Sequence, residues 1–220
     1  MINKNTLDFL KNLSENNNRV WFAEHKPEFD KIKKDFERFV TSLIASISHF
    51  DPDISHLEAK KCIFRINRDT RFSKNKAPYK INLWAHINAV SKLSQTPGSA
   101  GYYVHLEPGN CMLAWWAYMP DTKWLHDIRQ KIANNPKKFT DIIENKEFKK
   151  YFVFYSWEKL KRPPVWFPAD HEAIEMLKNK SFLADCKLSD KDVLSEGFLD
   201  FASGAFRELK KFNDFLNKDK

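Results

Sequence analysis

The hydrophobic residues of this chain change their spacing twice along the sequence, and this change constrains the fold more than any other feature. Up to about residue 50 they recur every three or four positions, most clearly from Phe29 to Ile47. From about 60 to 119 they largely alternate, and beyond 121 the helical spacing returns. Spacing of three and four is typical of amphipathic helices, and alternation is typical of strands with one buried face. The sequence therefore predicts helices, then a sheet, then helices.

The alternating region predicts four strands joined by short connections. They are expected over 62–68, 80–90, 101–107 and 111–119. A loop is expected over 91–100, and a turn at Pro108-Gly109. Consecutive strands with short links form an antiparallel meander. The predicted fold class is α+β, an antiparallel meander of about four or more strands flanked by N-terminal and C-terminal helices.

The whole chain, 1–220, is expected to form a single domain, because it contains no internal repeat and no linker long enough to separate a second one. The N-terminal helices are expected over about 5–50, the sheet over about 60–119 and a mainly helical C-terminal part over about 121–217. Within that last part, the proline-rich segment 161–168 is incompatible with a helix and is expected to cross a surface.

Composition places the chain among globular proteins, since 42% of its residues are hydrophobic and 15% are aromatic. The formal net charge of +8 is compatible with a nucleic-acid partner, although the lysines are spread along the whole sequence. Cys62, Cys111 and Cys186 match no metal-binding spacing and indicate a reducing compartment. The first residues do not resemble a signal peptide, and no apolar run approaches the ~20 residues of a membrane span. We therefore expect a soluble, cytoplasmic protein with no membrane partner.

Several families of chemistry are excluded by what the sequence lacks. None of the five glycines belongs to a phosphate-binding loop or a dinucleotide fingerprint. Neither the nucleophile elbow of the α/β-hydrolases nor the zinc-binding motif of metalloproteases occurs. We predict no cofactor and no metal site. The sequence identifies no reaction, so whether the protein is an enzyme stays open.

Residues 61–80 carry the most unusual distribution of charge. Six cationic side chains fall within sixteen positions: Arg65, Arg68, Arg71, Lys74, Lys76 and Lys80. Asp69 is the only acid among them. Like charges at this density repel one another unless something negative lies between them. The segment therefore indicates either an anion-binding site or a network completed by acids from elsewhere in the fold.

The outward face of the predicted sheet has the composition of a ligand pocket. If Leu83 and Ile87 face the core, Asn82, Trp84, His86 and Asn88 face the other way, together with Tyr103 on the next strand. Such a mixture of aromatic rings and hydrogen-bonding tips is usual in binding sites. The alternative is a polar face that is covered by a helix and satisfied internally.

His105 and Glu107 lie two positions apart on one predicted strand, so their side chains share a face. A histidine hydrogen-bonded to a carboxylate is a usual general-base arrangement, which makes this pair the candidate catalytic residues. The alternative is an isolated histidine whose hydrogen bonds are satisfied within the fold.

Three segments of the chain resemble a known family. They are residues 16–29 (NNNRVWFAEHKPEF), 61–80 (KCIFRINRDTRFSKNKAPYK) and 101–109 (GYYVHLEPG). Together they are similar to the domain of unknown function 2461 family, and the resemblance extends over nearly the whole chain. It implies one domain and brings no activity with it. The residues that match the family's central signature are Arg65, Arg68, Asp69, Arg71, Lys74, Lys76, Tyr79 and Lys80.

Three hypotheses follow for these signature residues. In the first, they form a pocket for an anionic small molecule bearing phosphate or carboxylate, in which Arg65 and Arg68 hold the anion. In the second, the 68–80 loop grips the phosphates of a nucleic acid while Trp84 or Tyr103 stacks on its bases. In the third, the cations form a structural salt-bridge network with acids such as Glu24, Glu28 or Glu107. The sequence does not give the oligomeric state.

Overall fold

The computed structural model describes residues 2–89, 100–117 and 120–217. Contacts between residues divide the chain into two compact units. Unit 1 consists of Met1–Leu93, Tyr103–Leu113 and Lys187–Ser203, and unit 2 of Ser94–Tyr102, Ala114–Cys186 and Gly204–Lys220. The single domain over 1–220 stays a prediction. No helix in the described ranges has both the length and the apolar character needed to cross a bilayer.

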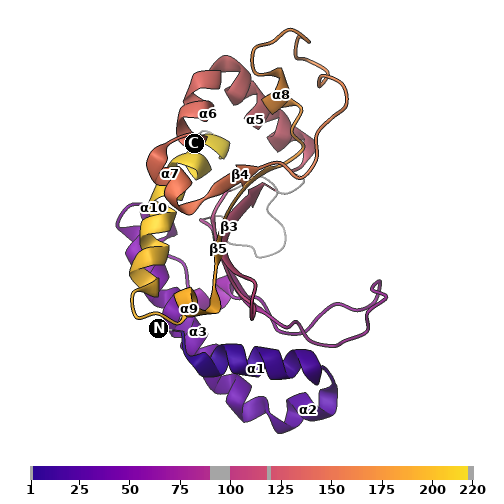
Figure 1. The fold of residues 1–220 in the computed structure, drawn as a ribbon, viewed down its shortest axis with the longest axis vertical. Helices are drawn as coiled ribbons and strands as arrows, with labels where there is room; N and C mark the ends of the chain where they lie inside the picture. Colours follow the sequence, from indigo (N-terminus) through magenta and orange to yellow (C-terminus); the bar gives the residue numbers. More distant parts are fainter. Residues whose placement is uncertain (1, 90–99, 118–119, 218–220) are drawn as a thin grey trace. The chain divides into compact units, whose positions relative to one another are not determined.

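The helices of unit 1 come mainly from the N-terminal region. They are α1 (Lys4–Glu15), α2 (Arg19–Glu24), α3 (Lys26–Ser48), the 3₁₀ turn η1 (Pro52–Ile54), α4 (Ala59–Cys62) and α9 (Asp190–Val193). Helix α3 buries all eight apolar positions of its predicted stripe, from Phe29 to Ile47. Helices α1 and α2 contact α3 (Figure 1). Asn18 caps α2 by accepting a hydrogen bond from the Trp21 N–H at 3.0 Å.

The strands form one open antiparallel sheet, which confirms the predicted α+β class. They are β1 (Leu83–Ile87), β2 (Tyr102–Leu106), β3 (Cys111–Ala117), β4 (Val153–Tyr155) and β5 (Phe182–Leu188). Their order across the sheet is β1-β2-β3-β5-β4. The predicted alternation on β1 is observed, since Leu83, Ala85 and Ile87 are buried and the residues between them are half-buried.

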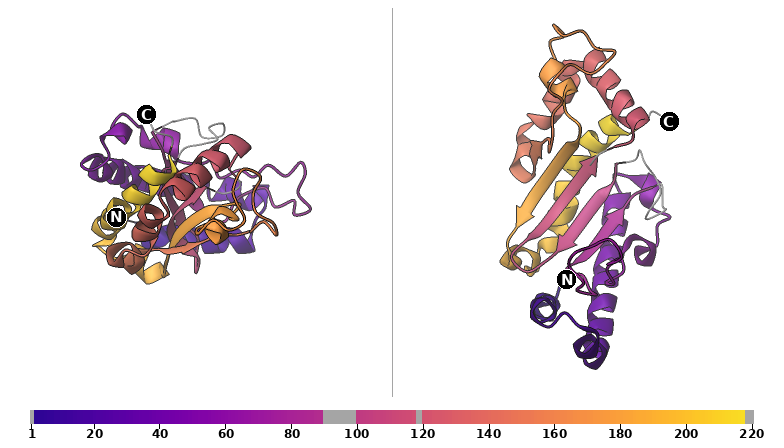
Figure 2. Two further views of the ribbon diagram at one scale, coloured as in Figure 1. Left: turned by 90° about the horizontal axis from the view of Figure 1, so that it is seen from above. Right: turned by 90° about the vertical axis from the view of Figure 1, so that its right-hand side faces the viewer.

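The predicted strand over 62–68 is wrong. Cys62 ends helix α4, and the residues after it make only isolated bridges, Ile63 to Ala85 and Asn67 to Tyr79. Pro78 contributes to the interruption, because proline has no N–H to donate to a ladder. The segment still runs antiparallel to 78–85, and the 68–78 portion projects as a loop (Figure 1, and Figure 2, left).

Strands β4 and β5 lie in the C-terminal part, which the sequence analysis described as mainly helical. Strand β5 is buried at six of its seven positions, with only Lys187 exposed. A strand buried on both faces has no alternation to reveal it. Residues 91–99 of the predicted loop 91–100 fall outside the described residues, as do the last residue of the predicted strand 80–90 and the last two of the predicted strand 111–119.

Unit 2 is built around aromatic rings. Its helices are α5 (Thr122–Asn134), α6 (Pro136–Ile143), α7 (Lys146–Tyr151), α8 (Ile174–Leu177) and the C-terminal portion of α10 (Phe198–Leu216). Phe212 on α10 lies within 5.7–6.2 Å, centroid to centroid, of four other rings. They belong to Trp115, Phe139, Phe148 and Phe154. The segment 161–168 is irregular, as its prolines predicted.

One side chain holds the projecting loop to the N-terminal helices. Asn17, in the turn between α1 and α2, accepts a hydrogen bond from the Tyr79 N–H at 3.1 Å. Its amide group donates to the Tyr79 carbonyl at 3.0 Å. The Tyr79 ring is buried and stacks on Phe22, with 4.0 Å between ring centroids. These contacts fix the position of the backbone at Tyr79, directly before Lys80 and close to the start of strand β1.

We expect Asn17→Ala to lower the free energy of unfolding by about 1–3 kcal/mol, because a half-buried N–H and carbonyl lose their partner. Equilibrium urea denaturation measures this loss. Asn16→Ala is the matched control: Asn16 is exposed, its side chain donates to Asn12 of its own helix, and the expected change is below about 1 kcal/mol. Equal losses in the two variants would contradict this role for Asn17.

Candidate functional site

A hollow of about 400 Å³ lies in unit 1, where the projecting loop meets strands β1 and β2. It is lined by Arg68, Asp69, Lys80, Asn82, Trp84, Tyr103 and His105. Two cations of the 61–80 signature therefore share one concavity with the polar face of the sheet. An anion pocket requires cationic side chains that converge on one concavity in this way.

Lys80 is placed in the hollow by its own backbone and by aromatic rings. Its N–H donates to the Ile66 carbonyl at 2.8 Å, and its ammonium donates to the Arg65 carbonyl at 2.8 Å. The ammonium lies 4.9 Å from the centroid of Trp84, which in turn stacks on Phe64. Partial burial, and then the charge of Arg65, lower the pKa of Lys80 below that of an ordinary lysine. An anion bound here would restore the stability of the charged form.

Arg68 is half-buried, and its guanidinium is weakly engaged. It donates to the Ala77 carbonyl at 3.3 Å and to the Ser73 hydroxyl at 3.4 Å, both near the outer limit for hydrogen bonds. Among the residues that the structure describes, no carboxylate lies within ion-pair distance of Arg68 or Lys80. A guanidinium has five N–H donors, so most of those of Arg68 remain available to a ligand.

Asp69 is committed to Arg71. The two side chains form a two-pronged ion pair, with 2.6 Å between Nη2 and Oδ2 and 3.0 Å between Nε and Oδ1. These hydrogen bonds hold the pKa of Asp69 down at about 2. Asp69 also accepts the Arg71 N–H at 3.2 Å, which closes a local turn. The single acid of the signature therefore orders its own loop and does not neutralise Arg68.

Tyr103, His105 and Glu107 form a hydrogen-bonded series on one face of the sheet. The Tyr103 hydroxyl lies 2.9 Å from His105 Nδ1, and His105 Nε2 lies 3.0 Å from a Glu107 carboxylate oxygen. A carboxylate only accepts, so Nε2 carries a proton, and in the neutral imidazole Nδ1 then accepts from the tyrosine hydroxyl. Glu107 also accepts from the Asn110 amide at 2.8 Å.

This hydrogen-bonded series changes the catalytic roles that the sequence predicted for His105 and Glu107. Both nitrogens of His105 are occupied, and Glu107 does not line the hollow. Tyr103 is therefore the member of the series that can meet a ligand. Burial, and then the charge of Glu107, raise the pKa of Tyr103, so its hydroxyl keeps its proton near neutral pH. The sequence predicted Tyr103 on this face. It did not predict that Tyr103 stands at the end of the hydrogen-bonded series.

Asn82 adds an unsatisfied polar atom to the lining. Its side-chain oxygen is buried and has no hydrogen-bond partner among the described residues. Buried polar atoms are nearly always paired, so Asn82 lacks a partner that an acceptor in this position normally has. His86, on the same face, has its pKa lowered to about 4 by burial and is neutral.

The other signature residues lie outside the hollow. Tyr79 is packed in the core, and Lys76 donates to the Thr70 carbonyl at 3.0 Å. Arg65, Arg71 and Lys74 are exposed along the loop. Within the described ranges, Glu24 and Glu28 pair with none of these cations, and Glu107 pairs with His105. The structural-network hypothesis therefore lacks the partners that it named.

The described residues form no cluster of side chains suited to a metal ion. No group of three or more histidine, cysteine, aspartate or glutamate side chains is arranged to hold a metal ion in the described parts of the chain. Cys62, Cys111 and Cys186 are all buried. Burial raises the pKa of Cys62 and of Cys111 to about 11, so neither is a reactive thiolate at neutral pH.

Comparison with known proteins gives a family and no characterised relative. No curated protein and no solved structure matches the chain. One family model, described as "Conserved hypothetical protein (DUF2461)", matches residues 5–215. That match covers nearly the whole sequence and includes every residue that lines the hollow. The chain belongs to the DUF2461 family.

Proposed function

We propose that this protein binds a small molecule bearing a phosphate or carboxylate group in the hollow of unit 1. The observation that carries the proposal is that Arg68 and Lys80 line one concavity without a carboxylate partner among the described residues. A partly buried cation without a counter-charge costs folding free energy, and a bound anion offsets that cost.

Each lining residue has a role in this proposal. The Arg68 guanidinium offers paired N–H donors to the anion, and Lys80 adds a point charge beside it. The Asn82 oxygen accepts from a hydroxyl or amine on the rest of the ligand. An enzymatic role rests on Tyr103, whose oxygen would accept a proton from the ligand as its own proton passes to His105 Nδ1, with Glu107 stabilising the protonated ring. Because binding can be tested alone, the acid–base step is a separate question.

Titration with inorganic phosphate tests the anion site. We expect calorimetric binding at low salt, and weakening of at least about tenfold in both Arg68→Ala and Lys80→Gln, from the loss of a charged hydrogen bond. Lys33→Gln, an exposed helix position with the same charge change, should bind like the parent chain. Affinity should also fall as salt rises.

Two results would overturn the anion site. One is the absence of phosphate binding to the parent chain at low salt. The other is a large fall in melting temperature for Arg68→Ala with unchanged binding by the folded fraction, which would make the cation structural.

The lowered pKa of Lys80 predicts how binding depends on pH. Its ammonium loses its proton at a lower pH than that of an ordinary lysine, so the decline of phosphate affinity at alkaline pH should begin below the pH at which an ordinary lysine titrates. Binding should be accompanied by proton uptake, because the anion favours the charged form. Lys80→Arg, which stays charged, should flatten the decline. Calorimetry in buffers of different ionisation enthalpy measures both; an identical decline in Lys80→Arg would assign it to another group.

Nucleic-acid binding is the second candidate, and one exposed ring favours it. Phe72 is 96% exposed near the tip of the loop, and the Arg71 guanidinium lies 5.8 Å from its centroid. Lys74 and Lys76 follow it. The two stacking residues expected from the sequence are engaged within the fold, because Trp84 stacks on Phe64 with the Lys80 ammonium 4.9 Å from its centroid, and Tyr103 is buried. Stacking would therefore fall to Phe72.

Fluorescence anisotropy with labelled single-stranded DNA and RNA separates the two candidates. If the loop grips nucleic acid, Phe72→Ala should weaken binding by about 1–3 kcal/mol, and Lys74→Gln should lower the salt slope by about one phosphate contact. Phe201→Ala, which removes a partly exposed phenylalanine elsewhere in unit 1, is the control. No binding of either oligonucleotide at low salt would remove this candidate.

A further inference from the structure

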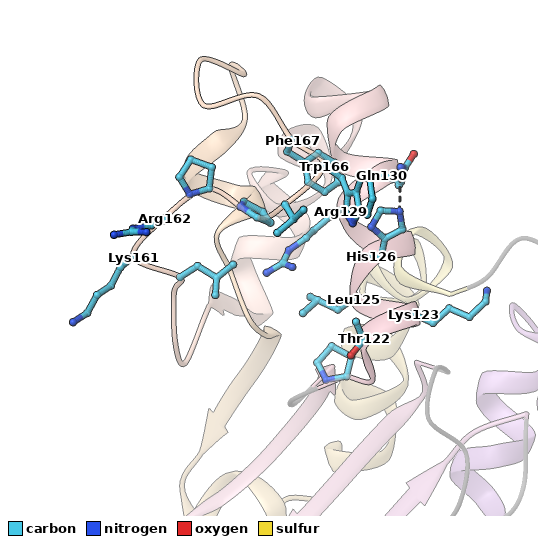
Figure 3. Close-up of a pocket in the computed structure, with 15 residues that line it drawn as sticks. Thr122, Lys123, Leu125, His126, Arg129, Gln130, Lys161, Arg162, Trp166 and Phe167 are labelled. Carbon is cyan, nitrogen blue, oxygen red and sulfur yellow. Dashed lines mark hydrogen bonds between the residues drawn. The ribbon is translucent and has the colours of Figure 1, made fainter.

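A second groove, of about 1160 Å³, lies within unit 2 between helix α5 and the proline-rich segment 160–167 (Figure 3). None of its lining residues is acidic, whereas Lys123, Arg129, Lys161 and Arg162 are cationic. The central signature of the family, 61–80, contributes no residue to this groove, and the function proposed above does not use it.

Arg129 is the buried cation of the groove. Its side chain is 9% exposed and reaches from α5 toward the segment that carries Lys161 and Arg162 (Figure 3). One guanidinium nitrogen donates to the Asn179 carbonyl at 2.9 Å. The Nε atom is buried and has no partner among the described residues. A buried guanidinium normally has a carboxylate beside it, and within the described ranges Arg129 has no such counter-charge.

The walls around Arg129 are largely apolar and aromatic. Leu125 and Phe167 line the groove, and the Phe167 ring lies 6.0 Å from that of His126, which is hydrogen-bonded to Gln130 at 3.2 Å. Trp166 is 81% exposed and has a φ of 84°, a strained conformation for a residue with a side chain. Such conformations cost stability and are concentrated at functional sites.

The cations at the rim have a different role from Arg129. In Figure 3 the side chains of Lys161 and Arg162 extend away from the groove. They give its entrance a positive potential, which attracts anions from solution. Pro163 and Pro164 restrict the backbone that supports them, so little conformational freedom is lost when a ligand binds.

We infer that this groove binds a small organic acid, with its carboxylate or phosphate group on Arg129 and its apolar body against Leu125 and Phe167. The anion supplies the charge that Arg129 lacks, and the two apolar side chains remove the body of the ligand from water. This site shares no residue with the hollow of unit 1, so the result of testing one site does not decide the other.

Fluorine NMR of the full chain labelled with 5-fluorotryptophan tests the inference, with the Trp166 signal assigned from Trp166→Phe. The probes are phenyl phosphate, benzoate and the neutral benzyl alcohol. We expect at least one anion at millimolar concentration to shift the Trp166 signal. Binding of phenyl phosphate alone, of benzoate alone or of both supports the site and identifies its preferred head group.

Matched variants assign that shift to Arg129. Arg129→Met should weaken binding of the anion at least about tenfold, as expected for loss of a charged hydrogen bond. Lys161→Met, with the same charge change at the rim, should alter affinity less than about threefold. Arg68→Ala should leave the Trp166 titration unchanged, which separates this site from the hollow of unit 1.

A second variant separates loss of binding from loss of folding. Arg129→Lys keeps the charge and removes the planar fork, so it should fold and bind the anion with intermediate affinity. The inference is overturned if neither anion shifts Trp166, if benzyl alcohol binds as tightly as the anions, or if folded Arg129→Met or Arg129→Lys binds them like the parent chain.

Discussion

The two hydrogen bonds between Asn17 and the backbone of Tyr79 connect residues 62 positions apart in the sequence, and the candidate site depends on them. No continuous ladder forms over 63–68, where the isolated bridges are Ile63 to Ala85 of β1 and Asn67 to Tyr79. Asn17 supplies the pairing that a neighbouring strand would supply elsewhere. Lys80 follows directly, so its position over Trp84 is a consequence of this contact.

Charge is distributed unevenly between the loop and the two binding regions. Asp69 and Arg71 satisfy each other at the surface, where a pair of this kind contributes little to stability. Arg68 and Lys80 in unit 1 and Arg129 in unit 2 are more buried, yet each lacks a carboxylate among the described residues. Proteins depart from the rules of stable folding mainly at functional sites, so these three cations are the positions where ligands are expected.

The hydrogen-bonded series in unit 1 is aligned by the pleat of strand β2. Tyr103, His105 and Glu107 occupy alternate positions on and just beyond β2, so their side chains point the same way. Each engages the next, and Tyr103 and His105 both line the hollow while Glu107 does not. Because both nitrogens of His105 are hydrogen-bonded within this series, Tyr103 is the member placed to exchange hydrogen bonds with a ligand.

The sequence by itself determined the elements whose signal is local: the stripe of α3, the alternation of β1 and the concentration of cations over 61–80. It also determined that His105 and Glu107 share a face. Only the tertiary structure decided that β5 is a strand, because burial on both faces removes the period of two, and that Tyr79 belongs to the core. It also separated Arg68 and Lys80 from Arg65, Arg71, Lys74 and Lys76, which look alike in the sequence. Which cation is buried depends on contacts such as the one from Asn17, and spacing along a chain does not encode them.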